Sequence, residues 1–231
     1  MSKTVDAVKK NLKINQNMPL KQSIYYALRK TIILGEISAG VRINEKEFSD
    51  SLNISRTPIR YALDELEKEN LVEYIPRTGC VVKGISIADA HEIYDIRKAL
   101  DTLATIKAFQ NMTEEDFAEL ESLLKEGDRL NELNDVDAVL KNFSDFNHFI
   151  YEKSRMIRLG SIVTKLQAYL VYFRDIAIRA SERRSLALKE HWLIYRGMKN
   201  KDIDQITLIT HEHLDRSLQF ILQEMERRKI E

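Results

Sequence analysis

The chain has 231 residues with 36 basic and 36 acidic side chains, so its formal net charge is zero. Hydrophobic residues make up 44%, and the 7 glycines and 3 prolines are too few for a collagen-like or proline-rich disordered chain. No stretch approaches the roughly 18 apolar residues of a membrane span, and the first residues lack the apolar segment of a secretory signal. The single cysteine, Cys80, cannot form an internal disulfide. We therefore expect a cytoplasmic protein without membrane association.

Charge and helix breakers divide the chain near residue 84. Residues 1–84 hold 14 basic and 10 acidic side chains and all three prolines, whereas residues 85–231 hold 22 basic and 26 acidic ones. A basic segment joined to an acidic body indicates a polyanionic partner. The proline-free part has a 3.6-residue apolar period, which predicts helices. We expect an extension over 1–19, a first domain over 20–84 and an all-helical domain over 85–231.

Three short helices are predicted in the first domain. The first covers 20–34 and ends at Gly35. The second is capped by Asn44, with Glu47 three residues later, and the third begins at Ser55 as its N-cap. The third helix has an apolar stripe that consists of Ile59, Ala62, Leu63 and Leu66. Two short helices joined by a tight turn form a helix-turn-helix, whose second helix meets the DNA major groove with its first residues.

Basic residues begin this third helix and also occupy the hairpin predicted to follow it. Arg56 and Arg60 are one turn apart, on a face away from the apolar stripe. Two alternating runs around Arg77, Thr78 and Gly79 predict a β-hairpin whose tip reaches phosphate or the minor groove. Any one of these arginines by itself is more often an ordinary solvated charge. The ordered set of capped helix, turn, arginine-led helix and hairpin tip is what favours DNA binding.

Residues 20–84 resemble the winged helix-turn-helix domain of the GntR superfamily of bacterial transcription regulators. The residues that carry the resemblance are Leu34-Gly35-Glu36, Ala39-Gly40, Asn44-Glu45, Ser55-Arg56-Thr57-Pro58-Ile59-Arg60, Ala62-Leu63, Leu66-Glu67, Asn70-Leu71-Val72, Arg77 and Gly79. The resemblance implies that double-stranded DNA is contacted by Arg56, Thr57, Arg60, Lys46 and the wing residues Arg77, Thr78 and Gly79. Tyr61 replaces a usual acidic residue, and Asn70 replaces a usual glycine.

Six helices are predicted after residue 85, which would pack as an antiparallel bundle. They begin near residues 86, 113, 135, 158, 183 and 202; the first has a stripe that consists of Ile93, Ile96, Leu100, Leu103 and Ala104. The charged end of the chain, Glu224 to Glu231, is predicted to be a solvated helix end. The fold class is therefore mostly α, a winged helix-turn-helix followed by a six-helix bundle.

This second part resembles the FCD domain of the FadR subgroup of GntR regulators. The residues that carry the resemblance are Glu92-Ile93-Tyr94-Asp95-Ile96-Arg97, Ala99-Leu100-Asp101, Phe146, Ile150, Ser154, Glu190-His191, Asp202 and His213-Leu214. The resemblance implies a divalent metal, such as zinc, nickel or manganese, held by an Asp, a His one turn later and two later histidines. His191 and His213 match the later two.

The first two metal positions depart from the family pattern. Phe143 stands at the usual Asp and Asn147 at the usual His. Either His148 or Asn147 then serves as a third ligand, or metal is absent and the two matching histidines are hydrogen-bonded groups of the bundle. Arg97 is the expected effector residue, because a guanidinium near a bundle core needs an anion. Its partner is either a bound carboxylate or Asp101 at i+4.

These patterns favour a ligand-responsive transcription regulator, with repression as the outcome that the resemblance implies. It would bind a short palindromic operator as a homodimer, since two half-sites need two recognition helices. The effector would be a citrate-like or other small organic acid, contacted by Arg97 with Tyr94 and Arg174. One alternative is an architectural DNA-binding protein without an effector. A helical metalloenzyme is disfavoured, because no catalytic constellation accompanies the histidines.

Overall fold

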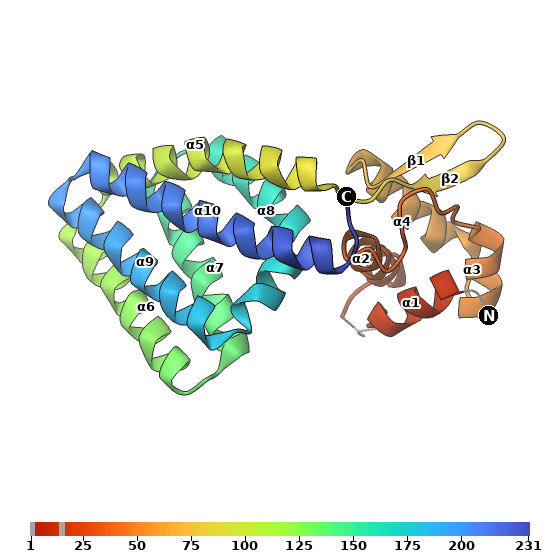
Figure 1. Cartoon of the computed structure of the whole chain (residues 1–231), viewed down its shortest axis with the longest axis horizontal. Coiled ribbons are helices and arrows are strands. Elements are labelled where there is room, and N and C mark those ends of the chain that lie inside the picture. The colour runs from red at the N-terminus through yellow and green to blue at the C-terminus, as the bar shows by residue number, and fades with distance from the viewer. Residues whose placement is uncertain (1–2, 14–16) are drawn as a thin grey trace. The chain divides into compact units, whose positions relative to one another are not determined.

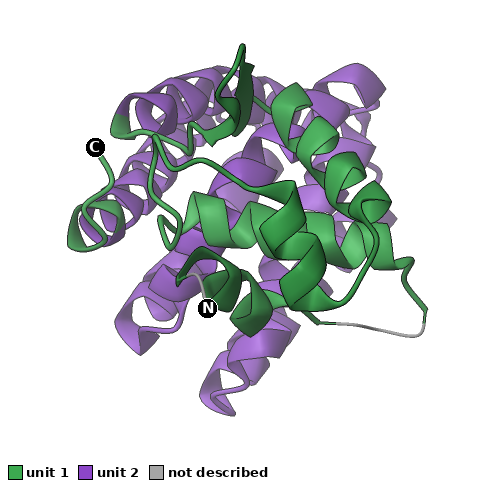
Figure 2. Ribbon diagram, turned by 90° about the vertical axis from the view of Figure 1, so that its right-hand side faces the viewer, with its two compact units in different colours: residues 1–87, 225–231 green, residues 88–224 purple. Residues whose placement is uncertain are grey.

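A computed structural model describes residues 3–13 and 17–231; residues 1–2 and 14–16 of the expected extension lie outside the described residues. The described residues form ten helices and one two-stranded sheet (Figure 1), which confirms the mostly helical fold class. They fall into two compact units (Figure 2). Unit 1 contains the described residues up to Ile87 together with Met225–Glu231, and unit 2 contains Ala88–Glu224. Within the described ranges, no helix is long and apolar enough to cross a lipid bilayer.

Unit 1 contains the predicted helix-turn-helix. Helix α2 (Leu20–Ile33) packs against α4 (Arg56–Lys68), and α4 buries the apolar stripe that the sequence predicts. The Asn44 side chain caps α3 (Glu45–Leu52) by accepting hydrogen bonds from two backbone amides, at 3.0 and 3.3 Å. Asn53 ends α3 with a left-handed φ of 53°. Ser55 is the N-cap of α4, as predicted, and its backbone is extended, but its side chain forms no capping hydrogen bond.

The predicted hairpin follows α4 and forms the wing. Strands β1 (Val72–Ile75) and β2 (Gly79–Val82) are antiparallel, and Ile75 pairs with Gly79 at the turn. The chain takes positive φ angles at Arg77 (66°) and at Gly79 (94°). A short segment before α3 extends the sheet, because the Ile43 amide donates to the Cys80 carbonyl at 2.9 Å.

Two segments pack in unit 1 that the sequence patterns did not assign to it. Helix α1 (Lys3–Asn11) buries Val5 and Val8 completely, and the Asn11 amide donates to the hydroxyl of Thr31 at 3.1 Å. The C-terminal segment Met225–Glu231 belongs to this unit as well.

The prediction of a solvated C-terminal helix end is therefore wrong. Met225 is fully buried, and Arg228 donates a hydrogen bond to the Leu34 carbonyl at 3.3 Å. A Cβ atom placed on Gly35 would lie 3.0 Å from Ile230, so these two residues are in close contact. The charged residues of this segment alternate along its exposed face, whereas the apolar residues Met225 and Ile230 pack within unit 1.

Unit 2 consists of the predicted six helices, which short turns connect. They are α5 (Ile87–Asn111), α6 (Glu114–Glu132), α7 (Val136–Lys153), α8 (Ile157–Ile178), α9 (Ser181–Asn200) and α10 (Ile203–Arg227). Thr113 and Asp116 form a reciprocal capping box at the start of α6. The central core consists of apolar side chains from α5, α6, α7, α8, α9 and α10.

The buried face of α5 is rotated from the predicted stripe. Ile96 and Leu103 are 39% and 37% exposed, whereas Arg97 and Asp101 are each only 8% exposed. Two charged residues can occupy the interior because they form an ion pair with each other, at 3.0 Å. This rotation places their side chains inside the bundle.

We expect Val8→Ala to lower the free energy of unfolding of unit 1 by about 2 kcal/mol, because it removes two fully buried methyl groups and leaves a cavity. Lys10→Ala, an exposed position on the same helix, is the matched control and should change stability little. Chemical denaturation followed by circular dichroism measures both. Equal, small effects of the two substitutions would contradict the packing of α1 described above.

Candidate functional site

The first candidate surface lies at the beginning of α4 and on α3. Arg56, Thr57, Arg60 and Lys46 are all exposed there. The Arg60 Nε donates to a carboxylate oxygen of Glu45 at 2.7 Å, and the Arg60 side chain remains 61% exposed. The N-terminal end of a helix also carries a partial positive charge. Cationic, hydrogen-bond-donating groups are thus gathered at one end of this helix.

The wing adds a second group of donors. Arg77 and Thr78 are exposed at its tip, and Gly79 is half-buried. The guanidinium of Arg42 lies against Gly79, 3.6 Å from where a Cβ atom would stand. Arg42 was not singled out from the sequence, because a lone arginine between two turns carries no pattern. The contact with Gly79 identifies it as a further candidate.

The two departures from the family pattern in unit 1 have local explanations. Asn70 has a φ of 60°, a left-handed conformation that asparagine tolerates nearly as well as the usual glycine. Tyr61 is half-buried, and the Lys21 ammonium lies 4.4 Å above its ring. This cation–π contact stabilises Tyr61 at the position where the family usually has an acidic residue.

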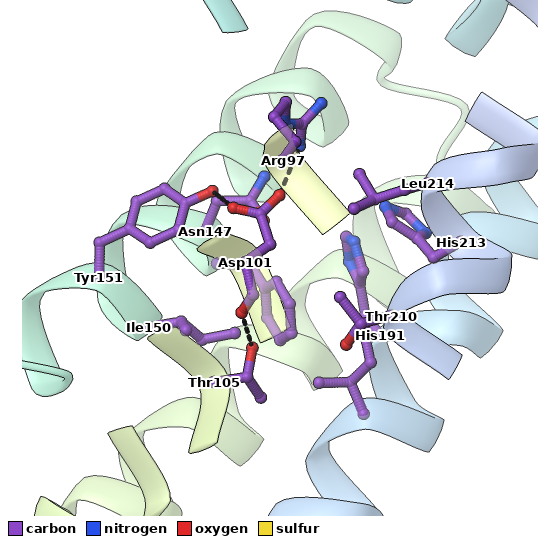
Figure 3. A pocket seen from close by; sticks show the side chains of 12 residues that line it. Arg97, Asp101, Thr105, Asn147, Ile150, Tyr151, His191, Thr210, His213 and Leu214 are labelled. Atoms are coloured by element: carbon purple, nitrogen blue, oxygen red, sulfur yellow. Dashed lines mark hydrogen bonds and ion pairs between the residues drawn. The ribbon is translucent and has the colours of Figure 1, made fainter. Parts of the chain in front are cut away.

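The second candidate site is a small cavity inside the bundle of unit 2. Side chains of α5, α7, α9 and α10 line it (Figure 3): Arg97, Asp101, Thr105, Phe146, Asn147, Ile150, Tyr151, His191, Ile194, Thr210, His213 and Leu214. Its volume of about 20 Å³ is about what one water molecule needs. A neighbouring cavity of about 30 Å³ shares five of these residues and is also lined by Arg174 and Arg183.

Asp101 organises one side of the cavity. Its carboxylate accepts hydrogen bonds from Arg97 at 3.0 Å and from the Tyr151 hydroxyl at 2.8 Å (Figure 3). Tyr151 in turn accepts a hydrogen bond from Gln167 at 2.9 Å. Burial acts to lower the pKa of Arg97, but Asp101, Tyr94 and Tyr151 together raise it above its ordinary value. The ion pair that the sequence offered as one of two partners for Arg97 is therefore formed.

Two histidines occupy the opposite side. The rings of His191 on α9 and His213 on α10 lie 5.0 Å apart, centroid to centroid. Phe146 stacks on His191 at 4.2 Å, and Phe143 meets its ring edge-on at 4.9 Å. Burial lowers the pKa of His191 well below its usual range, and His213 and Arg183 lower it further. His191 is therefore neutral at pH 7.

Glu190 holds the second histidine in place. Its buried carboxylate lies 2.6 Å from His213 Nδ1, 2.7 Å from Arg216 and 3.3 Å from Arg183. Burial would raise the pKa of Glu190, but its hydrogen bonds and cationic neighbours keep it below the ordinary value. Burial lowers the pKa of His213 as well, against the opposing effect of Glu190. The carboxylate of Glu190 is thus fully occupied.

Three buried polar atoms that line the first cavity have no hydrogen-bond partner among the described residues. They are Arg97 Nε, His191 Nδ1 and Thr210 Oγ1. Unpaired buried polar groups are rare, because each costs about 1–3 kcal/mol. A polar ligand, or a water molecule in its absence, is the natural partner of such a group.

The remaining candidates are divided between the interior and the surface. Asn147 is half-buried and lines both cavities, and Arg174 lines the second. Tyr94 is buried, but its hydroxyl pairs with Ser217 at 2.8 Å, and Arg97 lies 5.0 Å over its ring. His148 is exposed and lines neither cavity, because one residue along a helix turns a side chain by about 100°. Sequence reasoning missed Tyr151, Thr210 and Arg183.

The sequence of residues 20–82 matches the bacterial regulatory proteins of the gntR family, and residues 92–216 match the FCD domain. The chain belongs to the GntR family of regulators with an FCD domain. It resembles the HTH-type transcriptional regulator YdhC of Bacillus subtilis, with 27% identity over 219 residues, or 93% of this chain and 97% of YdhC. It also resembles the HTH-type transcriptional repressor RspR of Escherichia coli, with 25% identity over 201 residues, 87% and 88% of the two chains.

Solved structures agree with the fold of this GntR regulator. The structure of Escherichia coli McbR/YncC has a TM-score of 0.63 and 24% identity, and the match covers 89% of this chain and 98% of that one. The families and relatives that match are transcriptional regulators, so this protein is not an enzyme. Membership of the FadR subgroup stays a prediction.

The side chains of this FCD domain do not fit the metal that the family resemblance implies. Only His191 and His213 remain of the implied set. The hydrogen bond between His213 Nδ1 and Glu190 leaves Nε2 as the one ligand atom that His213 can offer. Phe143 offers no ligand atom, and Asn147 is a weak one compared with an imidazole or a carboxylate. Over residues 3–13 and 17–231, no group of three or more His, Cys, Asp or Glu side chains is placed to hold a metal ion.

The depressed pKa of His191 predicts how stability depends on pH. The unfolded chain takes up a proton near pH 6.5, whereas native His191 does so only at lower pH. The unfolded state therefore binds more protons below about pH 6.5, and stability falls on acidification by up to about 1.4 kcal/mol per pH unit for this group. His191→Gln should show a shallower loss between pH 7 and pH 5, measured by chemical denaturation.

His148→Gln is the matched control for this experiment, because His148 is an exposed histidine of the same unit. It should keep the wild-type pH dependence. If His191→Gln also kept it, the neutral, buried state of His191 in the native protein would be refuted.

Proposed function

We propose that this transcriptional regulator represses its target by binding a short palindromic operator as a homodimer. The observation that supports this most is the cationic beginning of α4. Arg56, Thr57 and Arg60 are exposed there and lie outside the buried apolar stripe of the helix. In a helix-turn-helix these positions reach base edges in the major groove, and two-fold symmetry of the operator requires two such helices. The wing, with Arg77 and Thr78, supplies backbone contacts beside them.

We propose further that a small carboxylate is the effector, bound in the bundle cavity. Arg97, Asn147 and Thr210 offer hydrogen-bond donors there, and a carboxylate is an acceptor-only group that suits them. Arg174 and Arg183 extend the cationic lining into the neighbouring cavity.

Helix α10 is the element that we propose couples the cavity to DNA binding. It supplies Thr210, His213 and Leu214 to the cavity, while its buried residue Met225 belongs to unit 1. A ligand that binds one conformation of the regulator better than another shifts the protein toward that conformation. The resulting change in operator affinity is limited by the ratio of the ligand's affinities for the two conformations. Such coupling is typically worth about 1–3 kcal/mol, or about 5- to 150-fold.

We expect Arg56→Ala to weaken binding to a DNA fragment from upstream of the protein's own gene by about 10- to 100-fold, the effect of one lost base contact. The salt dependence of binding should also become shallower if phosphate contacts are lost. Fluorescence anisotropy at several salt concentrations measures both. Arg158→Ala, an exposed arginine of unit 2, is the control. Equal affinities of the two variants would rule out the proposed recognition helix.

The dimer and the effector need separate measurements. Sedimentation should give a mass about twice the 27.0 kDa of the chain. A panel of carboxylic acids should contain at least one that raises the melting temperature and changes the operator Kd by about 5-fold or more. DNA binding that no acid alters, together with no thermal shift, would instead favour an architectural protein without an effector.

A further inference from the structure

Two carboxylates at or beside the bundle cavity already have partners: Asp101 lines the cavity, and Glu190 contacts the lining residue His213. Asp101 accepts hydrogen bonds from Arg97 and Tyr151, and Glu190 pairs with His213, Arg183 and Arg216. A divalent metal would need at least one anionic or imidazole ligand beyond the two histidines. Recruiting Asp101 or Glu190 would leave buried arginines unpaired, which costs several kcal/mol. The existing ion pairs thus compete with a metal ion for the carboxylates of Asp101 and Glu190.

Aromatic packing occupies the side of His191 that faces α7. Phe146 lies nearly parallel to the imidazole, with 11° between the planes, and Phe143 meets it edge-on. Both phenylalanines are at least 95% buried. These contacts hold the imidazole ring in place without a metal–ligand bond. What remains unsatisfied is the Nδ1 atom of His191.

The unsatisfied atoms of the cavity belong mainly to donors. Arg97 Nε and the Thr210 hydroxyl both carry a hydrogen that has no acceptor among the residues that the structure describes. His191 in its Nδ1–H tautomer would be a third donor, and the half-buried amide of Asn147 lines the same space. Donors without acceptors call for a ligand that offers oxygen lone pairs, as a carboxylate does. A metal cation would instead call for acceptors.

We propose that this FCD domain binds its acid directly, without a metal ion. One carboxylate of the ligand accepts hydrogen bonds from Arg97 Nε, Thr210 and His191, and its remaining atoms extend toward Arg174 and Arg183. The inference rests on the proposed effector function and specifies its chemistry. The cavities of about 20 and 30 Å³ each have room for about one water molecule. The proposed ligand is therefore a short acid of about two to four carbons rather than a tricarboxylate, and the lining side chains move apart when it binds.

The test uses full-length protein purified without chelator and analysed for bound metal by mass spectrometry. Acetate, lactate, malonate, succinate and citrate are then screened by thermal shift, each with and without EDTA. We expect metal well below one ion per chain, and a rise of about 5 °C or more for a short acid at a hundredfold excess over its Kd. EDTA should leave that rise unchanged.

Two variants make the test specific to the proposed donors. Thr210→Val keeps the shape of the side chain but removes its donor, so affinity for the acid should fall about tenfold. Thr207→Val, on the same helix but outside the cavity lining, is the matched control. Equal affinities of the two variants would overturn the assignment of Thr210.

A substitution that supplies the missing metal ligand tests whether its absence is what prevents metal binding. Asn147→His adds a third imidazole to the cavity and should create a zinc-dependent rise in melting temperature that the wild type lacks. A wild-type acid response that disappears in EDTA and returns with zinc would overturn the metal-free proposal, while leaving the effector function intact. If no acid shifts the melting temperature with or without zinc, the effector function itself fails.

Discussion

The buried carboxylate of Asp101 is the interaction on which the cavity depends. It binds Arg97 on its own helix and Tyr151 on α7, 50 residues away, and Tyr151 connects onward to Gln167 on α8. A buried ion pair adds little net stability, but complete hydrogen bonding makes its geometry specific. The network uses one terminal nitrogen of the Arg97 guanidinium and leaves Nε without a partner. It therefore determines which donor of Arg97 remains available.

The local features of unit 1 were predictable because short segments decide them. The Asn44 cap, the apolar stripe of α4 and the hairpin around Gly79 each depend on a few adjacent residues. The family resemblance added the roles of these elements, which periodicity alone does not contain. It also made Asn70 look anomalous, although its left-handed φ of 60° meets the same backbone requirement as a glycine.

Long-range contacts decided the features that sequence patterns missed. The packing of α1 depends on only two buried valines in a polar segment, and the C-terminal segment finds partners nearly 200 residues away, as Arg228 does at Leu34. The stripe of α5 was misplaced because Ile96 and Leu103 are apolar and fit the helical period, yet they are 39% and 37% exposed. Arg97 can be buried because it pairs with Asp101, whose carboxylate Tyr151 also binds. The contact with Tyr151 joins residues 50 apart in the sequence, so no short segment predicts it.

The cavity also explains why the bundle keeps polar groups in its interior at all. An apolar replacement of Arg97, Asp101 and Tyr151 would remove both the buried ion pair and the unpaired Nε of Arg97. Natural proteins depart from such packing mainly where a site is needed, so Arg97 Nε, Thr210 and His191 are informative as a set. On a solvent-exposed surface, each of these three groups would contribute little binding energy, because water would compete for the same hydrogen bonds. In the buried cavity the same donors discriminate strongly, because an analogue without the carboxylate leaves all of them without their acceptor.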